Sequence, residues 1–231
     1  MFKTGILENN KYAKIVVGAN IAVVVLALLV LLGWVFDIPT VKSIIPGYIT
    51  MKINTAISFL MIALAFLLQA AGGKDKLYLS RLMAGIALVL TALTLLQYIT
   101  GADFGVDQFL GVDNNLTGSL HPGRMSLVTI TCFLLLCIVL LTFNVTERYY
   151  RLAMQGLLHL VTLLSFTAIV GYIFNVPGFY TLSVLTTMAI HTAVAFFVLS
   201  IALSLVHPTV GITGVFTGTN IGNEMARRVF V

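Results

Sequence analysis

The sequence has little charge. Asp, Glu, Lys and Arg make up 9% of its 231 residues, whereas 59% of the residues are hydrophobic and the mean hydropathy is +1.06. A soluble domain is about 25% charged, because charged side chains cover its surface. The composition therefore excludes a water-soluble enzyme domain. It also excludes a disordered chain, which would be polar and rich in charge.

Cysteine is scarce as well, with only Cys132 and Cys137 in the chain. Two cysteines cannot build a disulfide scaffold, and their spacing places them about 140° apart around a helix. We expect both to pack as small apolar side chains. The sequence also lacks a phosphate-binding loop and the GxGxxG, GxSxG, HExxH and CxxC patterns. It therefore predicts that the chain is not itself an enzyme and has no metal site.

Long apolar runs dominate what remains. A membrane helix needs about 20 mainly apolar residues, and six runs meet this requirement: 15–36, 53–71, 82–99, 125–143, 152–174 and 185–206. The sequence thus predicts an all-α integral membrane protein with six transmembrane helices. Residues 1–14 precede this membrane domain (15–207), and a glycine-rich tail (208–231) follows it, near whose end a new apolar segment begins.

The basic residues predict the orientation of the spans. Ten of the 13 Lys and Arg residues fall on one side of the predicted membrane: Lys3, Lys11, Lys14, Lys74, Lys76, Arg81, Arg148, Arg151, Arg227 and Arg228. Only Lys42, Lys52 and Arg124 fall on the other. Cytoplasmic loops carry the excess of Lys and Arg, so both termini are predicted to be cytoplasmic. The basic side favours contact with anionic lipid, and the net charge of +5 needs no nucleic acid as a partner.

The chain repeats itself. Three even-numbered spans start with similar sequences, MKINTAISFL (51–60), MSLVTITCFL (125–134) and MAIHTAVAFF (188–197). The preceding spans end in GWVFDIP (33–39), QYITGAD (97–103) and GYIFNVP (171–177), each with an aromatic residue in second place. The predicted unit is a helical hairpin. Its three copies, about 15–71, 82–143 and 152–206, share one orientation and are therefore parallel repeats.

Equivalent positions converge if the three hairpins pack around a pseudo-threefold axis. The fourth residue of the repeated sequence is Asn54, Val128 or His191, and Thr55, Thr129 or Thr192 follows it. Polar groups avoid lipid, so we expect Asn54 and His191 to meet inside the bundle near the outer loops. Such residues either hydrogen-bond neighbouring helices or line a ligand pocket. His121 and Arg124, in the long outer loop of about 100–124, are candidates at its rim.

The histidines leave a redox cofactor open as an alternative. His159 and His191 lie at different predicted depths and make a poor pair of axial haem ligands, and no two histidines have the spacing of a metal site on one helix. We expect no cofactor, with haem or quinone as the alternative.

The runs FDIPTVKSIIPGYITMKINTAISFLMIALAFLL (36–68), HPGRMS (121–126) and MAIHTAVAF (188–196) resemble the amino-terminal multi-span sensor region of bacterial histidine kinases and diguanylate cyclases. This resemblance covers essentially the whole chain. It implies two further spans and then a cytoplasmic kinase or cyclase domain beyond 226–228, so the chain would be a truncated receptor. It also implies Asn at position 54 and His at position 191, whereas Val128 departs from the pattern.

The sequence thus favours a sensory input module in the bacterial inner membrane. It would detect a small or lipophilic signal near the outer leaflet and pass it to a kinase or cyclase domain in cis or in trans. By analogy with sensor kinases, it would act as a homodimer. The alternatives are a redox membrane protein, a transporter and a structural membrane partner.

Overall fold

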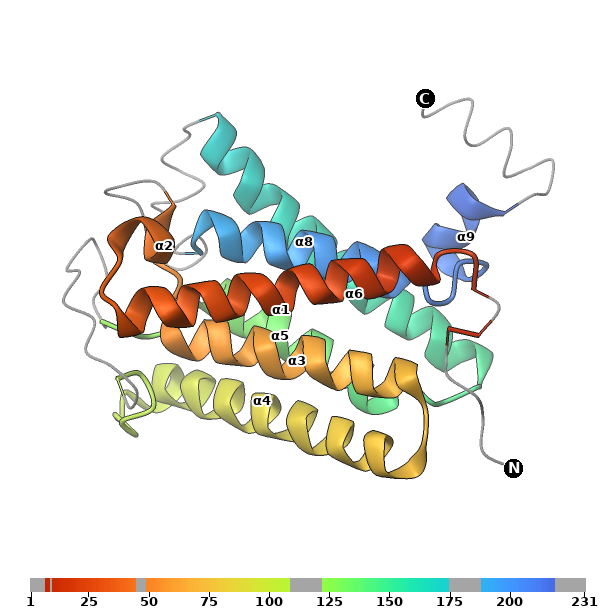
Figure 1. Cartoon of the computed structure of the whole chain (residues 1–231), viewed down its shortest axis with the longest axis horizontal. Helices are drawn as coiled ribbons and strands as arrows, with labels where there is room; N and C mark the ends of the chain where they lie inside the picture. Colours follow the sequence, from red (N-terminus) through yellow and green to blue (C-terminus); the bar gives the residue numbers. More distant parts are fainter. Residues whose placement is uncertain (1–6, 9, 45–48, 109–121, 175–187, 219–231) are drawn as a thin grey trace.

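A computed structural model describes residues 7–8, 10–44, 49–108, 122–174 and 188–218. Throughout these ranges the secondary structure is helical (Figure 1). The helices are α1 (Ala13–Val35), α2 (Pro39–Ser43), α3 (Ile53–Ala71), α4 (Lys74–Thr100), α5 (Leu127–Thr142), α6 (Arg148–Ile173), α8 (Ile190–Ser204) and α9 (Gly211–Thr217).

Four helices, α1, α3, α4 and α6, are long and apolar enough to cross a membrane. Two further apolar helices, α5 and α8, have 16 and 15 residues, which corresponds to about 24 and 22 Å at 1.5 Å per residue. The prediction of an all-helical chain with membrane-spanning character is therefore confirmed.

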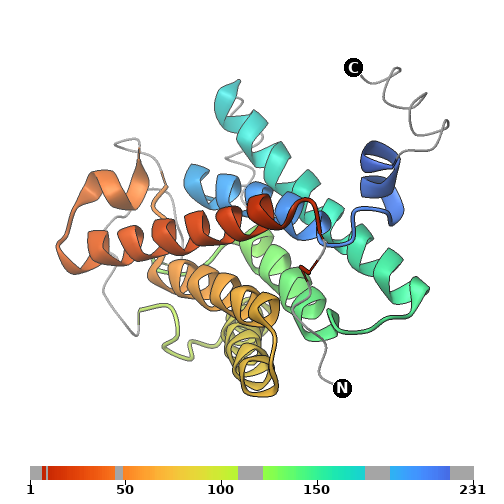
Figure 2. The same cartoon turned by 45° about the vertical axis from the view of Figure 1, so that its right-hand side comes forward.

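Six helices form a closed ring. Neighbours along the chain pack together in the order α1, α3, α4, α5, α6 and α8, and α8 returns to contact α1. Within the ring, α5 also contacts α3 and α8. Figure 1 shows α1, α3 and α4 running side by side, whereas α6 crosses the bundle obliquely, which Figure 2 also shows. We call α3, α5 and α8 the inner helices and α1, α4 and α6 the outer helices.

Three phenylalanines form the centre of the bundle. Phe59 of α3, Phe133 of α5 and Phe196 of α8 contact one another in all three pairings, with ring centroids 4.5 to 4.8 Å apart. Such distances favour tilted or edge-to-face aromatic packing. The next layer along the same helices contains Ile62, Leu136 and Leu199, all fully buried. The inner helices therefore share one core.

The outer helices expose apolar side chains. Leu29 of α1, Val89 of α4 and Leu163 of α6 are each exposed by half or more. A helix that is apolar on all sides belongs in a protein core or in a membrane. Because these side chains face away from the core, the outer surface of the bundle is apolar and suited to contact with lipid acyl chains.

The helix boundaries correct three predictions. Helix α4 begins at Lys74 rather than 82, and α6 begins at Arg148 rather than 152, because charged first turns can project beyond an apolar segment and remain helical. Helix α8 begins at Ile190, later than the predicted 185. Residues 185–187 lie outside the described part of the chain, and Ala189 is extended.

The tail after residue 207 is rich in glycine, yet Gly211–Thr217 forms a short helix, α9. Gly211 has a φ of +58°, a conformation that glycine adopts without strain. This residue therefore turns the chain into the helix. The predicted apolar segment at the end of the tail lies outside the described residues.

Candidate functional site

Three equivalent hydrogen bonds define one end of the bundle. In each, an aromatic side chain near the end of an outer helix donates to the carbonyl of a methionine just before an inner helix. The pairs are Trp34 Nε1 to Met51 (2.9 Å), Tyr98 Oη to Met125 (3.0 Å) and Tyr172 Oη to Met188 (2.7 Å). All three inner helices therefore begin at the same end, which we call the loop end.

The opposite end is rich in positive charge, and we call it the basic end. Helix α1 begins there beside Lys11 and Lys14, α4 begins at Lys74, and α6 begins at Arg148. The inner helices finish at this end.

The polar residues predicted for the site occupy the first turn of the inner helices. Asn54, Thr55, Thr129, His191 and Thr192 are all buried, with at most 5% of each residue exposed. Asn54 and His191 each precede a central phenylalanine by five residues, or about 7.5 Å of helix. They therefore lie at one level between that cluster and the loop end. We call these five residues the polar layer.

The side-chain amide of Asn54 makes hydrogen bonds within the protein. Its Nδ2 donates to the carbonyl of Gly123 at 3.3 Å, and its Oδ1 accepts from the backbone N–H of Thr55 at 2.8 Å. Asn54 thus ties the start of α3 to the segment that precedes α5. It does not hydrogen-bond the ring of His191.

Position 123 requires glycine, because the backbone of Asp107 lies very close to it. The φ of Gly123 is +78°, and a Cβ at this position would lie 2.5 Å from the carbonyl oxygen of Asp107. Only glycine fits such an approach without displacement of the backbone. The Gly-Arg pair of the HPGRMS sequence therefore fixes where Arg124 enters the bundle.

Arg124 is not an open binding group at the rim, as its sequence position suggested. Its Nε donates to Asp107 Oδ2 at 2.7 Å, and both side chains are less than a tenth exposed. The guanidinium also lies over the ring of Tyr98, 5.2 Å from its centroid. Gln97 donates to the same Asp107 oxygen at 3.1 Å. Arg124 therefore holds the loop end together.

Thr129 belongs to a helix cap. Ser126 Oγ lies 2.8 Å from Thr129 Oγ1 and accepts from the backbone N–H of Thr129 at 3.2 Å. Ser126 is therefore the N-cap of α5, and its hydroxyl accepts a hydrogen bond from a backbone N–H that has no partner within the helix. Thr129 therefore has a structural role in α5.

His191 differs from the other members of the polar layer. Its ring is buried, with 2% of the residue exposed, and neither ring nitrogen has a hydrogen-bond partner among the described residues. A buried polar group normally has a partner, because losing its hydration costs free energy. Thr192 is buried next to it in the chain. His121, the other predicted rim residue, lies outside the described residues.

The remaining histidines lie at the basic end. His159 Nε2 lies 3.1 Å from Thr213 Oγ1 of α9, and Thr213 in turn donates to Gln155 Oε1 at 2.9 Å. His207 stacks on Phe143, with ring centroids 5.7 Å apart. Burial lowers the pKa of His207, and the nearby cation of Arg151 lowers it further. His159 is thus a partnered polar side chain.

Metal-ligating residues do not gather in the part of the chain that the structure describes, where no group of three His, Cys, Asp or Glu side chains is placed to hold an ion. Cys132 and Cys137 are both buried and unpaired, which confirms that they pack as apolar side chains.

Sequence reasoning found the polar layer but missed the residues that brace it. Gln97 and Asp107 gave no periodic signal, because Gln97 is a single polar residue in the last turn of α4 and Asp107 lies in a loop. The aromatic donors did leave a signal, since an aromatic residue recurs in second place at 34, 98 and 172.

No protein family, curated protein or solved structure matches this chain.

Proposed function

We propose that this chain is the membrane-embedded input module of a bacterial signal-transduction receptor. Its six apolar helices cross the inner membrane as three parallel hairpins, with both termini in the cytoplasm. A small or lipophilic signal binds in the polar layer near the outer leaflet and shifts the packing of the inner helices. A cytoplasmic kinase or cyclase domain, in cis or in trans, receives that shift.

The observation that carries the proposal is the buried ring of His191, neither of whose nitrogens has a hydrogen-bond partner among the described residues. Leaving a buried polar group without a partner costs about 1–3 kcal/mol. A ligand that hydrogen-bonds this ring recovers that cost. If it does so in only one packing of the helices, it shifts the equilibrium between the two packings. Output then follows occupancy of the site.

Two repeated contacts support the arrangement in three hairpins. The aromatic-to-methionine hydrogen bond occurs once in each hairpin, and the three phenylalanines at equivalent positions meet in the centre. Helices α5 and α8 are shorter than the hydrocarbon core of about 30 Å. Because the longer outer helices pack beside them, the lengths of α5 and α8 need not match the thickness of the bilayer.

The orientation rests on the distribution of Lys and Arg. Reporter fusions test it directly. Alkaline phosphatase fused after Lys76 should be inactive, and the same enzyme fused after Asp103 should be active, because it folds only outside the cytoplasm. The reverse pattern would refute the proposed topology.

A redox cofactor in the polar layer is the second candidate. It is favoured by the ring of His191, whose nitrogens have no hydrogen-bond partner in the part of the chain that the structure describes. A haem held by His159 and His191 together is not favoured. His159 contacts α9 at the basic end, whereas His191 lies in the first turn of α8 at the loop end. An absorption spectrum and a quinone assay of the purified protein test this candidate. Substrate flux in sealed vesicles tests a transporter.

The reading frame of the gene tests the receptor proposal. We expect it to continue beyond Val231 into further spans and a kinase or cyclase domain, or to lie beside a gene for such a partner. A stop codon after Val231 with no such gene nearby, together with a haem spectrum in the purified protein, would refute the receptor proposal and favour a redox membrane protein.

A further inference from the structure

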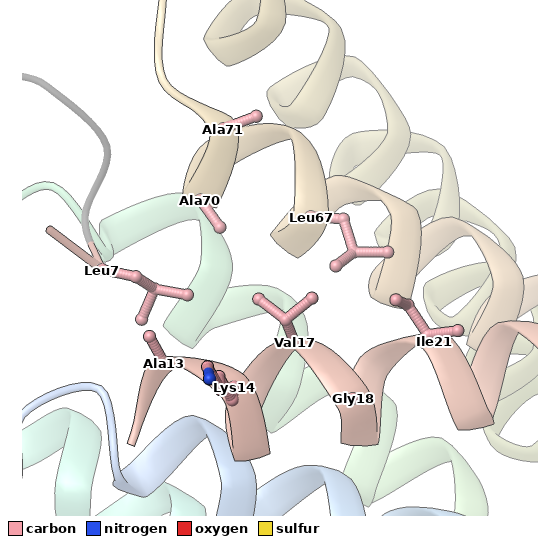
Figure 3. Close-up of a pocket in the computed structure, with 9 residues that line it drawn as sticks. All are labelled: Leu7, Ala13, Lys14, Val17, Gly18, Ile21, Leu67, Ala70 and Ala71. Carbon is pink, nitrogen blue, oxygen red and sulfur yellow. The ribbon is translucent and has the colours of Figure 1, made fainter. Parts of the chain in front are cut away.

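A groove runs along the surface of the bundle between α1 and α3, close to the basic end (Figure 3). It has a volume of about 620 Å³. Leu7, the first half of α1 and the last turns of α3 form its walls, and Lys14 is the only charged residue among them. The groove is thus apolar along its length and carries a cation.

Small residues create this space. Gly18 has no side chain, and a Cβ built there would meet no atom within 4 Å. Ala70 and Ala71 line the groove at the end of α3, and the methyl group of Ala70 points toward α1 (Figure 3). The buried stripe of α1, which includes Val16 and Asn20, lies on the other side of that helix. The groove therefore opens away from the core, toward the lipid.

The groove reaches the ends of two helices that are long and apolar enough to cross a membrane. Ala13 is the first residue of α1 and Ala71 is the last residue of α3, so one end of the groove coincides with the ends of two apolar helices. A lysine at such a helix end extends its ammonium to the head-group region. Lys14 is exposed, and its ammonium makes no ion pair with any described residue.

Further lysines lie close in the chain to the residues that line the groove. Lys11 precedes Lys14 by one turn, and Lys74 and Lys76 follow the two glycines that end α3. The acidic residues nearby in the chain are Glu8 and Asp75, so the lysines outnumber the carboxylates. Basic residues at a helix end attract anionic lipid. The charge therefore complements a phosphate group.

We propose that this groove is a binding site for one anionic phospholipid, with an acyl chain between α1 and α3 and the phosphate on Lys14. Apolar surfaces gain no hydrophobic attraction for one another in lipid, so the acyl chain alone gives no selectivity. The contact of the phosphate with Lys14 supplies it. The site depends on membrane insertion and is independent of the proposed signalling role.

Native mass spectrometry of the purified full chain tests this proposal, with phosphatidylglycerol and phosphatidylcholine as competing probes. We expect the wild type to retain phosphatidylglycerol preferentially. Lys14→Gln should lower the ratio of the two bound lipids about fivefold, the effect of one lysine at an anionic surface. Lys76→Gln, which removes a lysine outside the groove, should lower it much less.

Filling the groove tests the position of the acyl chain. Gly18→Leu should reduce the retention of either lipid, whereas Gly156→Leu should not, because Gly156 is also an exposed helical glycine with open space at its Cβ. Ala71→Leu serves as a second groove-filling variant if Gly18→Leu does not fold. Equal retention of the two lipids by the wild type would overturn the proposal. So would unchanged retention in the groove-filling variants, or the loss of a protein dimer in them, which would assign the groove to a second copy of the chain.

Discussion

The rings of Phe59 and Phe196 pack with their centroids 4.5 Å apart, although one residue belongs to α3 and the other to α8. Phe133 of α5 contacts both rings. All three residues occupy the same place in the similar sequences MKINTAISFL, MSLVTITCFL and MAIHTAVAFF. Helices α3, α5 and α8 therefore meet in one register, which places their starts at a single level.

Phe59→Ala should destabilise the bundle strongly. The substitution opens a cavity in the centre, where Phe→Ala changes cost about 3–5 kcal/mol in well-packed cores. Phe36→Ala is the matched control, because Phe36 is 68% exposed at the end of α1. Thermal unfolding in detergent measures both. A similar melting temperature for the two variants would contradict the central role of the three rings.

Asp107→Asn should also destabilise the protein. It leaves the guanidinium of Arg124 buried without its counter-charge, and breaking one side of a buried pair costs about 3–5 kcal/mol. Asp103→Asn is the control, because Asp103 is exposed and accepts from the same Gln97 amide. Replacing both partners, with Asp107→Leu and Arg124→Met, should recover much of the loss. If Asp107→Asn unfolds no more readily than Asp103→Asn, the ion pair does not hold the loop end.

Stability should fall in mild acid because of His207. The pKa of this ring is lowered in the folded protein by burial and by Arg151, whereas the unfolded value is about 6.5. Below about pH 6.5 the unfolded chain therefore binds more protons than the folded one, and stability decreases as the pH falls. Melting temperatures at pH 7.5 and 5.5 should differ less in His207→Gln than in the wild type. An identical difference would refute this contribution.

Gln155→Leu should release α9. The amide of Gln155 donates to the carbonyl of Ser204 at 2.8 Å and accepts from Thr213 at 2.9 Å, so it links α6, α8 and α9. Amide hydrogen exchange over 211–217 should accelerate in the variant. Gln69→Leu removes a comparable buried glutamine, which bonds Ser80 and the carbonyl of Leu140, and should leave exchange over 211–217 unchanged. Equal exchange in the two variants would show that α9 docks by other contacts.

The sequence predicted the helices better than the contacts between them. Helix α3 has the bounds expected for its apolar run, 53–71, because a pair of glycines ends it. The start of α8 was misjudged because apolar residues continue into the preceding segment. Helix α9 was not predicted, because it lies in a glycine-rich segment, and glycine disfavours helices.

The candidate site was predicted only in part. The repeat identified Asn54 and His191 and their common level, since equivalent positions in a repeat share their depth. It did not reveal that Asn54 bonds Gly123, because that contact joins α3 to a loop. The ion pair between Arg124 and Asp107 could not be predicted either. It joins two parts of a long loop, and loop residues follow no periodic pattern from which their contacts could be inferred.

The central claim is that His191 is the signal-binding group, and the output of the full-length receptor tests it most directly. His191→Leu is compared with Val128→Leu, which changes the equivalent apolar position of α5. Kinase or cyclase activity in membrane vesicles is measured at rest and after addition of a quinone analogue, a reductant or a short-chain alcohol. We expect His191→Leu to change resting or stimulated output at least about fivefold, the usual lower range of coupling between sites, and Val128→Leu to leave it near wild type. Wild-type output from His191→Leu under every condition would contradict the account.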